Sequence, residues 1–513
     1  MSTTTEKLQR APRQFLLKPP TQAKVSVSGS LSPSATAFGV LVSMTGETPK
    51  QLGLSRERMA ATGFTGEAGS TLTIPGVDGP ILVAVGVGGG DEVDAARLRD
   101  AAAAFASAAA TQDRLAFALA GSSVVPIDVA AQAAVEGMLL ARYEYAGFGR
   151  ELKRRPIKEI QLVVDTAQQA VAKVGADRGL AYANATIVAR DLANTPHSHL
   201  TATHLATLAT QLGKEHGFTV EVFDKPALEK LSCGGLLGVN AGSIEPPCMI
   251  KLSYKPKAAA TGRIAFVGKG IMYDSGGISL KPNDNVHARM KNDMSGAAAV
   301  LAAVAELPDL DCTTAVTAYL MCTDNMPSST AMALGDIITT HGGKTVEVNN
   351  TDAEGRLVMC DALALAAEEK HDAIIDIATL TGSVMRALGT DLAGLFGNDE
   401  ALIAQVEHAA EATGERVWQM PLHKPYRKAL DSDVAAMRNT GPTGGTQPDG
   451  IVAALYLAEF VGESPWVHID ICGTAWYDRD ELWRRAGCSG FGARLLIELA
   501  MNFRASARAT TRH

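Results

Sequence analysis

Three charged side chains stand at alternate positions within residues 349–363, NNTDAEGRLVMCDAL: Asp352, Glu354 and Arg356. The preceding segment is typical of a strand (TVEVNN), and the following one is typical of a helix (RLVMCDALALAAEE). Residues two apart in an extended backbone point the same way, so the two carboxylates can aim at one point, where they repel unless a cation lies between them. Arg356 at the helix start could hold an anion. Taken alone, the stretch is explained equally well as a capped helix start with a solvent-exposed ion pair.

A second segment, residues 267–300, supplies further polar groups (VGKGIMYDSGGISLKPNDNVHARMKNDMSGAAAV). Lys269 and Asp274 follow the strand-like run RIAFV, at what we expect to be a carboxyl edge of a sheet. Lys281 lies beyond a Gly-Gly turn, and Asp293 stands just before an Ala-rich helix. Together the two segments predict four converging carboxylates, an oxygen-rich set that suits a hard or borderline divalent metal.

This set is large enough for a hydrolytic two-metal centre. Such a centre needs carboxylates that bridge two ions about 3.5 to 4 Å apart and a bound water that becomes the nucleophile. Burial and adjacent cations could lower the pKa of a nearby lysine from about 10.4, and only a neutral amine can bind a metal. One of the two lysines could therefore be a ligand and the other a charged stabiliser of an oxyanion.

The elements that must position these groups form an α/β protein. In the first third, the runs ILVAVGVGGG, DEVDAARLRDAAAAFASAAA and RLAFALAG predict strand, helix and strand. Residues 167–194 are Ala-rich with helical spacing and end at Thr195-Pro196, which indicates a long helix joining two domains. Beyond it, strand-like and helical runs alternate, which favours a mixed, largely parallel sheet flanked by helices.

Composition excludes several classes of protein. The 513 residues carry a formal net charge of -8, which gives no global reason for nucleic-acid binding, and we interpret the one basic cluster, RELKRRPIK at residues 150–158, as a solvated linker surface. The seven cysteines form no CxxC pair, which argues against a disulfide framework or a zinc ribbon. No secretory signal is visible in the first 20 residues, and no apolar run reaches the roughly 18 residues of a membrane span. We expect a soluble, cytoplasmic protein without a membrane partner.

Other catalytic motifs are missing. The sequence holds no HExxH, no P-loop and no G-x-S-x-G, and Asp91 replaces the third glycine of a dinucleotide fingerprint in GVGGGD. Cys360 and Cys472, on a predicted helix and a predicted strand with apolar neighbours, are interpreted as inert buried thiols. Three histidines are interpreted as ordinary surface or sheet residues: His287, His341 and His468.

Three segments, VGKGIMYDSGGISLKP, MKNDMSGAAAV and NTDAEGRLVMCDAL, closely resemble the signatures of the leucyl aminopeptidase (M17 cytosol aminopeptidase) family. Further similar segments extend the resemblance over about residues 189 to 500, among them ARDLANTP, ATLTGSVMRALG and HIDICGTAW. The resemblance implies a smaller N-terminal α/β domain, which we place at residues 1–173. It also implies a linking helix and a C-terminal di-metal peptidase domain, placed at residues 174–513, and a homohexamer built as a dimer of trimers.

The resemblance implies that five residues bind two divalent ions, Mn²⁺ or Zn²⁺: Lys269, Asp274, Asp293, Asp352 and Glu354. Two of these carboxylates, Asp274 and Glu354, would bridge the ions. A hydroxide held between the ions would attack the first peptide bond, Asp293 and one metal would receive the free α-amine, and Lys281 would stabilise the oxyanion. Arg356 would hold a bicarbonate that serves as general base.

Five positions match the family's substrate pocket: Met290, Thr379, Leu380, Gly382 and Cys472. Their apolar character favours leucine or methionine over a charged residue, and Cys472 stands where alanine is usual. The sequence thus predicts a metal-dependent aminopeptidase that acts on peptides.

Two alternatives remain. Some members of this family bind DNA, so a DNA-binding regulatory role is the first, with RELKRRPIK as its only support. A carboxylate-metal phosphoesterase shares the ligand set but lacks a phosphate-cradling loop.

Overall fold

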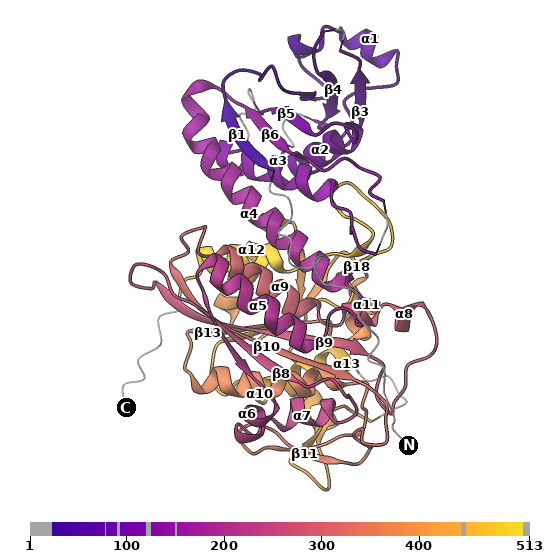
Figure 1. The fold of residues 1–513 in the computed structure, drawn as a ribbon, viewed down its shortest axis with the longest axis vertical. Helices are drawn as coiled ribbons and strands as arrows, with labels where there is room; N and C mark the ends of the chain where they lie inside the picture. The colour runs from indigo at the N-terminus through magenta and orange to yellow at the C-terminus, as the bar shows by residue number, and fades with distance from the viewer. Residues whose placement is uncertain are drawn as a thin grey trace, which may run out of the picture.

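The computed structural model describes residues 23–76, 78–89, 93–119, 125–148, 151–442 and 448–505. The N-terminal segment tested for a signal, Asp91 and Arg150 lie outside these residues. The described chain forms a smaller N-terminal lobe and a larger C-terminal lobe joined by one long helix (Figure 1). Within the described residues, no helix combines the length and apolar character needed to cross a membrane.

The N-terminal lobe is built on a six-stranded sheet in the order β1-β6-β5-β2-β4-β3. All neighbouring strands are parallel except β3 and β4. The predicted strand-helix-strand unit is β4, α2 and β5, with β2 inserted between its two strands. The bounds are β1 Lys24–Ser28, β2 Ala37–Val42, α1 Arg56–Ala60, β3 Thr71–Ile74, β4 Ile81–Gly86, α2 Ala95–Ala108, β5 Arg114–Ala118, α3 Ile127–Ala141 and β6 Glu159–Val163.

The predicted joining helix is α4, Gln169–Asn194, which ends before Thr195-Pro196. It runs diagonally from the N-terminal lobe into the C-terminal lobe (Figure 1). Glycine allows it to approach α3 closely, because a Cβ at Gly175 would lie 1.9 Å from the carbonyl oxygen of Asp128. The domain boundary between residues 173 and 174 falls inside this helix and stays a prediction.

The C-terminal lobe contains an eight-stranded sheet in the order β15-β14-β17-β13-β9-β10-β8-β7. The strands β17, β13, β9 and β10 are parallel neighbours, whereas β8, β7 and the β14–β17 pair are antiparallel, so the mixed sheet is confirmed. Its strands are β7 Thr219–Phe223, β8 Cys248–Tyr254, β9 Gly262–Asp274, β10 Thr314–Asn325, β13 Ala373–Ala378, β14 Ala393–Gly397, β15 Val417–Gln419 and β17 Trp466–Asp470.

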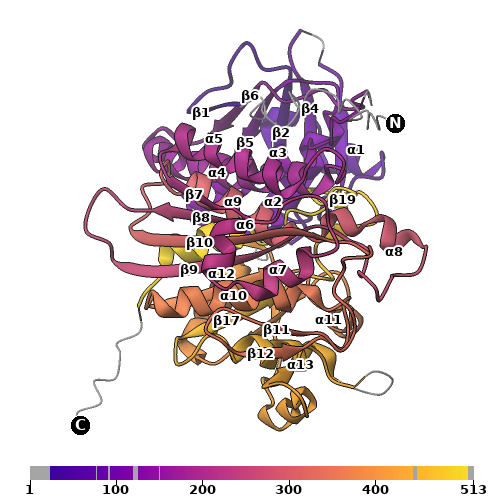
Figure 2. The ribbon, with the colours of Figure 1, turned by 60° about the horizontal axis from the view of Figure 1, so that its bottom comes forward.

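Helices cover both faces of this sheet (Figure 2). Strand β9 shows the alternation: Ile264 and Phe266 enter a core shared with α4, α5, α9, α12 and α14, whereas Ala265 and Val267 enter a core shared with α7, α10 and α13. The helices are α5 Ala202–His216, α6 Lys225–Lys230, α7 Gly234–Asn240, α8 Asn285–Ala288, α9 Ser295–Glu306, α10 Glu354–Glu368, α11 Gly382–Leu388, α12 Glu400–Thr413, α13 Asp449–Ala458 and α14 Ala493–Asn502.

Two small sheets complete the lobe. The three-stranded sheet contains β11 Ile337–Thr339, β12 Thr345–Glu347 and β16 Met437–Arg438, and the two-stranded sheet contains β18 Trp476–Tyr477 and β19 Gly487–Cys488. The loop between β18 and β19 reaches the N-terminal lobe, where the Trp483 indole donates to Asp100 at 3.0 Å.

The two lobes also share a buried network of charges. Arg99 Nε lies 2.8 Å from Glu136 Oε2, and Arg494 Nη1 lies 2.9 Å from the same oxygen. Arg494 Nη2 lies 3.5 Å from Glu415 Oε1. These four residues, called the interlobe network below, connect α2 and α3 with α14 and the segment after α12.

Candidate metal centre and substrate cleft

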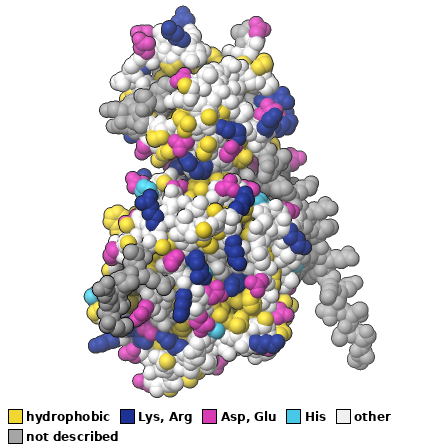
Figure 3. Space-filling model, turned by 90° about the vertical axis from the view of Figure 1, so that its left-hand side faces the viewer, with side chains coloured by type: hydrophobic (Ala, Val, Ile, Leu, Met, Phe, Trp, Pro, Cys, Tyr) yellow, Lys and Arg dark blue, Asp and Glu magenta, His cyan; other side chains and the backbone are white. Residues whose placement is uncertain are grey.

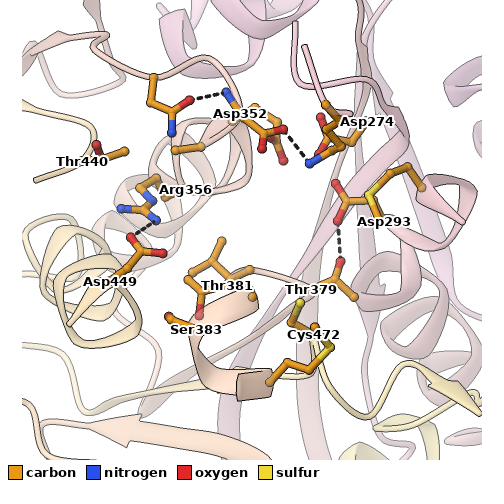
Figure 4. A pocket seen from close by; sticks show the side chains of 18 of the residues that line it. Asp274, Asp293, Asp352, Arg356, Thr379, Thr381, Ser383, Thr440, Asp449 and Cys472 are labelled. Carbon is orange, nitrogen blue, oxygen red and sulfur yellow. Dashed lines mark hydrogen bonds and ion pairs between the residues drawn. The ribbon is translucent and has the colours of Figure 1, made fainter. Parts of the chain in front are cut away.

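Two separate segments bring the predicted ligands together. Strand β9 extends beyond RIAFV to Asp274, so Lys269 lies within the strand and Asp274 is its last residue. Asp293 follows a short 3-10 helix just before α9, and Glu354 is the first residue of α10. Figure 4 shows Asp274, Asp293 and Asp352 around one open space.

The geometric argument from strand alternation is wrong. Strand β12 ends at Glu347 and belongs to the three-stranded sheet, not to the central sheet. Asp352 lies in a turn, Ala353 has φ -115° and ψ 42°, and Glu354 is already helical. The two carboxylates therefore converge because a turn leads directly into α10, and not because residues alternate along an extended strand.

Three carboxylates form the centre of the cluster. Asp274, Asp352 and Glu354 each offer one oxygen, and these oxygens all lie within 4.8 Å of one another. Asn325, at the end of β10, was not singled out from the sequence. Its Nδ2 donates to Asp274 Oδ1 at 2.8 Å and to Glu354 Oε2 at 3.4 Å, which orients both groups.

Lys269 bridges two carboxylates at the buried end of the cluster. Its Nζ lies 2.8 Å from Asp293 Oδ2 and 2.8 Å from Glu354 Oε1. It also donates to the Thr379 carbonyl oxygen at 2.8 Å. Burial alone would lower the pKa of Lys269, but the charges of Asp293 and Glu354 raise it above its ordinary value. The lowered pKa expected beside cations is therefore not produced by the protein groups alone.

Lys281 connects the other two carboxylates. Its Nζ lies 2.7 Å from Asp274 Oδ2 and 2.5 Å from Asp352 Oδ1. Burial opposes the charged amine, and the charges of Asp274 and Glu354 overcome it, so the pKa of Lys281 is also raised. This side chain therefore stays cationic at neutral pH.

The carboxylates differ in their affinity for protons. Burial raises the pKa of Asp293 well above its usual range and also raises that of Asp274. Burial and the charge of Asp274 raise the pKa of Asp352 to about 6. Burial would raise the pKa of Glu354 too, but Lys269 and Lys281 lower it to about 2. Four carboxyl groups share two ammonium groups, so the cluster carries an excess of negative charge once Asp293 and Asp274, whose pKa values are raised, have lost their protons.

The cluster fits divalent metal ions on its own chemistry. Its donors are carboxylate oxygens gathered within a few ångströms, as hard and borderline ions require. Two buried oxygens, Asp293 Oδ2 and Asp352 Oδ1, accept no hydrogen bond and meet only an ammonium group at salt-bridge distance. These oxygens therefore have lone pairs available to bind a metal ion.

A cleft of about 560 Å³ opens onto this cluster. All twelve residues predicted for the site line it: Lys269, Asp274, Lys281, Met290, Asp293, Asp352, Glu354, Arg356, Thr379, Leu380, Gly382 and Cys472. The structure therefore brings the predicted ligands, the two non-ligand residues and the five pocket residues to one place. Their individual roles stay predictions.

Two pocket residues have informative surroundings. Thr379 Oγ1 donates to Asp293 Oδ1 at 2.7 Å (Figure 4), which ties the pocket wall to a predicted ligand. Cys472 lies two residues beyond β17, in a turn and not on the strand that we expected. Burial raises the pKa of its thiol to about 12, which agrees with an inert thiol.

Arg356 lies on the opposite side of the cleft, in the first turn of α10 (Figure 4). Its side chain is 3% exposed. Nη1 donates to the Asn439 carbonyl oxygen at 3.0 Å, and Nη2 donates to Asp449 Oδ1 at 3.2 Å. Asp449 is the first residue of α13. It was not identified from the sequence, because only the folded structure shows that it lies in the cleft.

The three histidines lie outside the carboxylate cluster. His468 is fully buried in β17 and pairs with Asp376, 2.5 Å from Nδ1 to Oδ1. His341 lies in a turn, with Nδ1 2.6 Å from the Leu231 carbonyl oxygen. His287 lies in α8, with its ring 5.9 Å from that of Tyr273. His468 is thus a sheet residue as expected, whereas His341 and His287 are half-buried in a turn and in a short helix.

Part of the basic segment is paired with nearby acids. Arg154 lies 3.3 Å from Glu144 and 3.4 Å from Asp480, and Lys158 lies 3.0 Å from Asp113. On the face shown in Figure 3, basic and acidic side chains are interspersed. This pairing agrees with a surface that faces solvent.

Known proteins resemble the chain over both lobes. The model "Cytosol aminopeptidase family, catalytic domain" matches residues 187–497, and "Cytosol aminopeptidase family, N-terminal domain" matches residues 52–152. A probable cytosol aminopeptidase of Streptomyces avermitilis is 44% identical over 461 residues, covering 86% of this chain and 88% of the relative. One from Chlorobium luteolum is 41% identical over 462 residues, covering 85% and 90%.

The chain is also similar to a solved structure in its three-dimensional fold. The bottromycin maturation enzyme BotP in complex with Mn has a TM-score of 0.82 and 34% sequence identity, and the match covers 92% of this chain and 99% of that one. None of these relatives is described as a DNA-binding protein or a phosphoesterase.

Proposed function

The chain belongs to the cytosol aminopeptidase family, and from this premise we propose that it is a two-metal leucyl aminopeptidase. The family assignment makes it an aminopeptidase and a hydrolase. The proposal adds the metals, the preference for leucine and other apolar N-terminal residues, and the residues that act. One observation carries it: within the cleft, four carboxyl groups and two lysines form one cluster beside apolar pocket residues.

Five residues would hold the two ions, Mn²⁺ or Zn²⁺: Lys269, Asp274, Asp293, Asp352 and Glu354. Bound there, the ions would polarise the scissile carbonyl and make a water molecule a nucleophile at neutral pH. The solved relative is a complex with Mn, which supports the use of a metal. A raised pKa means that Lys269 must lose a proton before its amine binds an ion, so metal loading releases a proton.

The chain's own residues would bind and orient the peptide. Asp293, fixed by Thr379, would receive the free α-amine, and this contact restricts cleavage to the N-terminus. Lys281 would remain charged and stabilise the oxyanion that develops on the carbonyl oxygen. Both side chains face the same cleft, so one extended substrate can meet them together.

The pocket favours apolar side chains. Met290, Leu380 and Cys472 present carbon and sulfur surfaces, and Gly382 leaves room because it has no side chain. Burying a leucine side chain there would contribute roughly 1.5–3 kcal/mol. These four residues themselves offer no charged partner to a substrate side chain.

Chelation followed by metal add-back tests the proposal. After treatment with a chelator, hydrolysis of leucine p-nitroanilide should disappear, and Mn²⁺ or Zn²⁺ should restore it. Lys281→Met should lose most turnover, whereas Lys257→Met, at a lysine 88% exposed and paired with Asp311, should not. Activity indifferent to metal would end the proposal. A phosphate ester assayed in parallel distinguishes an aminopeptidase, which should not hydrolyse it, from a phosphoesterase.

The family resemblance also supports a homohexamer in the cytosol. We propose a dimer of trimers, which sedimentation of the purified protein would test. The names of the curated relatives support the cytosolic location. The bicarbonate expected at Arg356 stays a prediction. Asp449 accepts from Nη2, while the buried Nε has no hydrogen-bond partner among the described residues. The DNA-binding alternative gains no support from the relatives.

A further inference from the structure

One cationic side chain of the cleft has no partner among the described residues. Four of the five cations that line the cleft each lie within 3.2 Å of a carboxylate oxygen: Lys269, Lys281, Arg289 and Arg356. The fifth is Arg386, whose exposed side chain makes no hydrogen bond or ion pair with any residue that the structure describes. A guanidinium stays charged at any working pH and offers several N–H donors in a planar fork. Arg386 is therefore available to bind an anion.

Arg386 lies beside the predicted side-chain pocket. It is in α11, one turn after the pocket residue Gly382, and residues four apart share one face of a helix. Its Nη1 lies 3.6 Å from the position that a Cβ on Gly382 would take, so the guanidinium lies next to the room that this glycine leaves. Ser383, in the same helix, lies across the open space from Asp274 and Asp352 (Figure 4). The helix that carries Arg386 and the carboxylate cluster therefore line different sides of one cleft.

These two sides suit the opposite charges of a peptide. The carboxylate cluster suits an N-terminal ammonium group, whereas a guanidinium binds a carboxylate through paired, charge-assisted hydrogen bonds. A leucine side chain would use only the apolar part of the pocket. A glutamate side chain is longer and ends in a carboxylate, so it would extend past Gly382 toward Arg386. The cleft thus offers more than an apolar pocket to a substrate.

We infer that Arg386 binds a carboxylate of the substrate, so that the enzyme takes acidic N-terminal residues in addition to apolar ones. This inference rests on the proposed aminopeptidase function. The place of Arg386 beside Gly382 favours the side chain of an N-terminal glutamate or aspartate as the source of the carboxylate. The free C-terminal carboxylate of a dipeptide has the same chemistry and is distinguished by a separate assay. Arg386 determines specificity and takes no part in breaking the peptide bond.

Paired substrates test the inference on the metal-loaded enzyme. The first pair is glutamate p-nitroanilide and leucine p-nitroanilide, and the second is leucyl-glycine and leucyl-glycinamide, which differ only in the C-terminal carboxylate. In Arg386→Met, the ratio of kcat/KM for the glutamate substrate to that for the leucine substrate should fall about tenfold, as expected for one lost hydrogen bond to a charged group. A fall in the second ratio instead would identify the C-terminal carboxylate as the bound group.

Reversing the charge gives a result that misfolding cannot imitate. Arg386→Glu should lower the glutamate ratio further and raise hydrolysis of lysine p-nitroanilide relative to leucine p-nitroanilide, because the new carboxylate attracts an ammonium group. Arg416→Met is the matched control, since Arg416 is exposed and lies outside the cleft, and both ratios should stay unchanged. Metal content and circular dichroism confirm that each variant is loaded and folded.

Arg386 also lies in the last turn of α11, where a cation is favourable to the helix dipole. A role of that kind alone would lower the melting temperature of Arg386→Met and leave both ratios unchanged, and this result would overturn the inference. An Arg386→Glu variant that hydrolyses all three p-nitroanilides in the wild-type proportions would overturn it too. The proposed function fails separately, if the wild type shows no metal-dependent hydrolysis of any of these substrates.

Discussion

The cleft and the interlobe network both bury several charges, but they balance them differently. In the interlobe network two arginines meet two glutamates, and Glu136 lies between Arg99 and Arg494 at 2.8 and 2.9 Å. In the carboxylate cluster of the cleft, four carboxyl groups meet two lysines. Burial alone thus does not identify a functional site. An unbalanced charge does, because a stable fold tolerates it only where a ligand will supply the missing charge.

The pKa values show this contrast only in part. Burial opposes the charge of Glu136, yet Arg99 and Arg494 hold its pKa below the usual range. In the cleft, burial raises the pKa of Asp293 and Asp274 even though lysines lie close by. Each region also holds the opposite case, because burial raises the pKa of Glu415 in the interlobe network while Lys269 and Lys281 lower that of Glu354 in the cluster. The balance of charges, and not the direction of single pKa shifts, therefore separates the two regions.

The largest effect should follow from removing a carboxylate from the cleft. Glu354→Gln keeps the shape but takes away one predicted ligand of both ions. Loss of metal would cost several kcal/mol of transition-state stabilisation, and 4 kcal/mol corresponds to about a thousandfold in kcat/KM. In the presence of chelator, the melting temperature should fall only moderately, because Lys269 and Lys281 stabilise the ionised Glu354 but both keep other carboxylate partners. Equal activity, or marked destabilisation of the metal-free protein, would contradict the comparison.

Removing a charge from the interlobe network should have the opposite effect: it should lower stability and leave activity unchanged. Glu136→Gln leaves Arg99 and Arg494 buried without their counter-charge, which should cost about 3–5 kcal/mol of unfolding free energy. The specific activity of the molecules that remain folded should be unchanged, because the network lies outside the cleft. Denaturant unfolding and active-site titration measure the two quantities. Glu159→Gln is the control, since Glu159 pairs with Arg114 at 3.7 Å on the surface.

Much of the fold was predictable from local patterns. The helix α4, the alternation of strands and helices, and the mixed central sheet follow from periodicity and from Thr195-Pro196. The gathering of the site residues was expected from the family's signature segments. The reason given for it was wrong, because β12 is short and joins another sheet while Glu354 starts a helix.

The remaining features depend on contacts between distant parts of the chain. Glu136 and Arg494 are 358 residues apart, and Arg356 and Asp449 are 93 apart, so no short pattern links either pair. Asn325 ends an apolar strand and gives no sign by itself that it donates to two predicted ligands. Only tertiary folding fixes these partners.

Glu306 is a third kind of buried carboxyl group, because no nearby cation among the described residues offsets the effect of burial on its pKa. Burial and the charge of Asp309 raise the pKa of Glu306 to about 8. In the unfolded chain this group ionises near pH 4.3, so the native state retains a proton that the unfolded state has lost. The stability that it contributes is present below that pH and is lost as the pH rises to about 8, at up to about 1.4 kcal/mol per pH unit.

Glu306→Gln should remove this pH dependence. Relative to the wild type, the variant should gain melting temperature between pH 5 and pH 8 and gain nothing further above that. Thermal unfolding at both pH values measures the difference. Glu407→Gln, at an exposed position of α12, serves as control, and the same pH response in both variants would contradict the assignment.

The smallest effect is expected where charges are paired at the surface. Arg154→Ala removes the contacts to Glu144 at 3.3 Å and Asp480 at 3.4 Å, and exposed pairs contribute about 0.2–1 kcal/mol each. The melting temperature should therefore fall only slightly, and less at high salt, because salt screens exposed charges. Because these acids already neutralise Arg154, a gel shift with duplex DNA at low salt should be absent in both the wild type and the variant. A gel shift of the wild type that disappears in the variant would show that Arg154 is free to bind DNA phosphates. The cleft would then not be the only region with unbalanced charge.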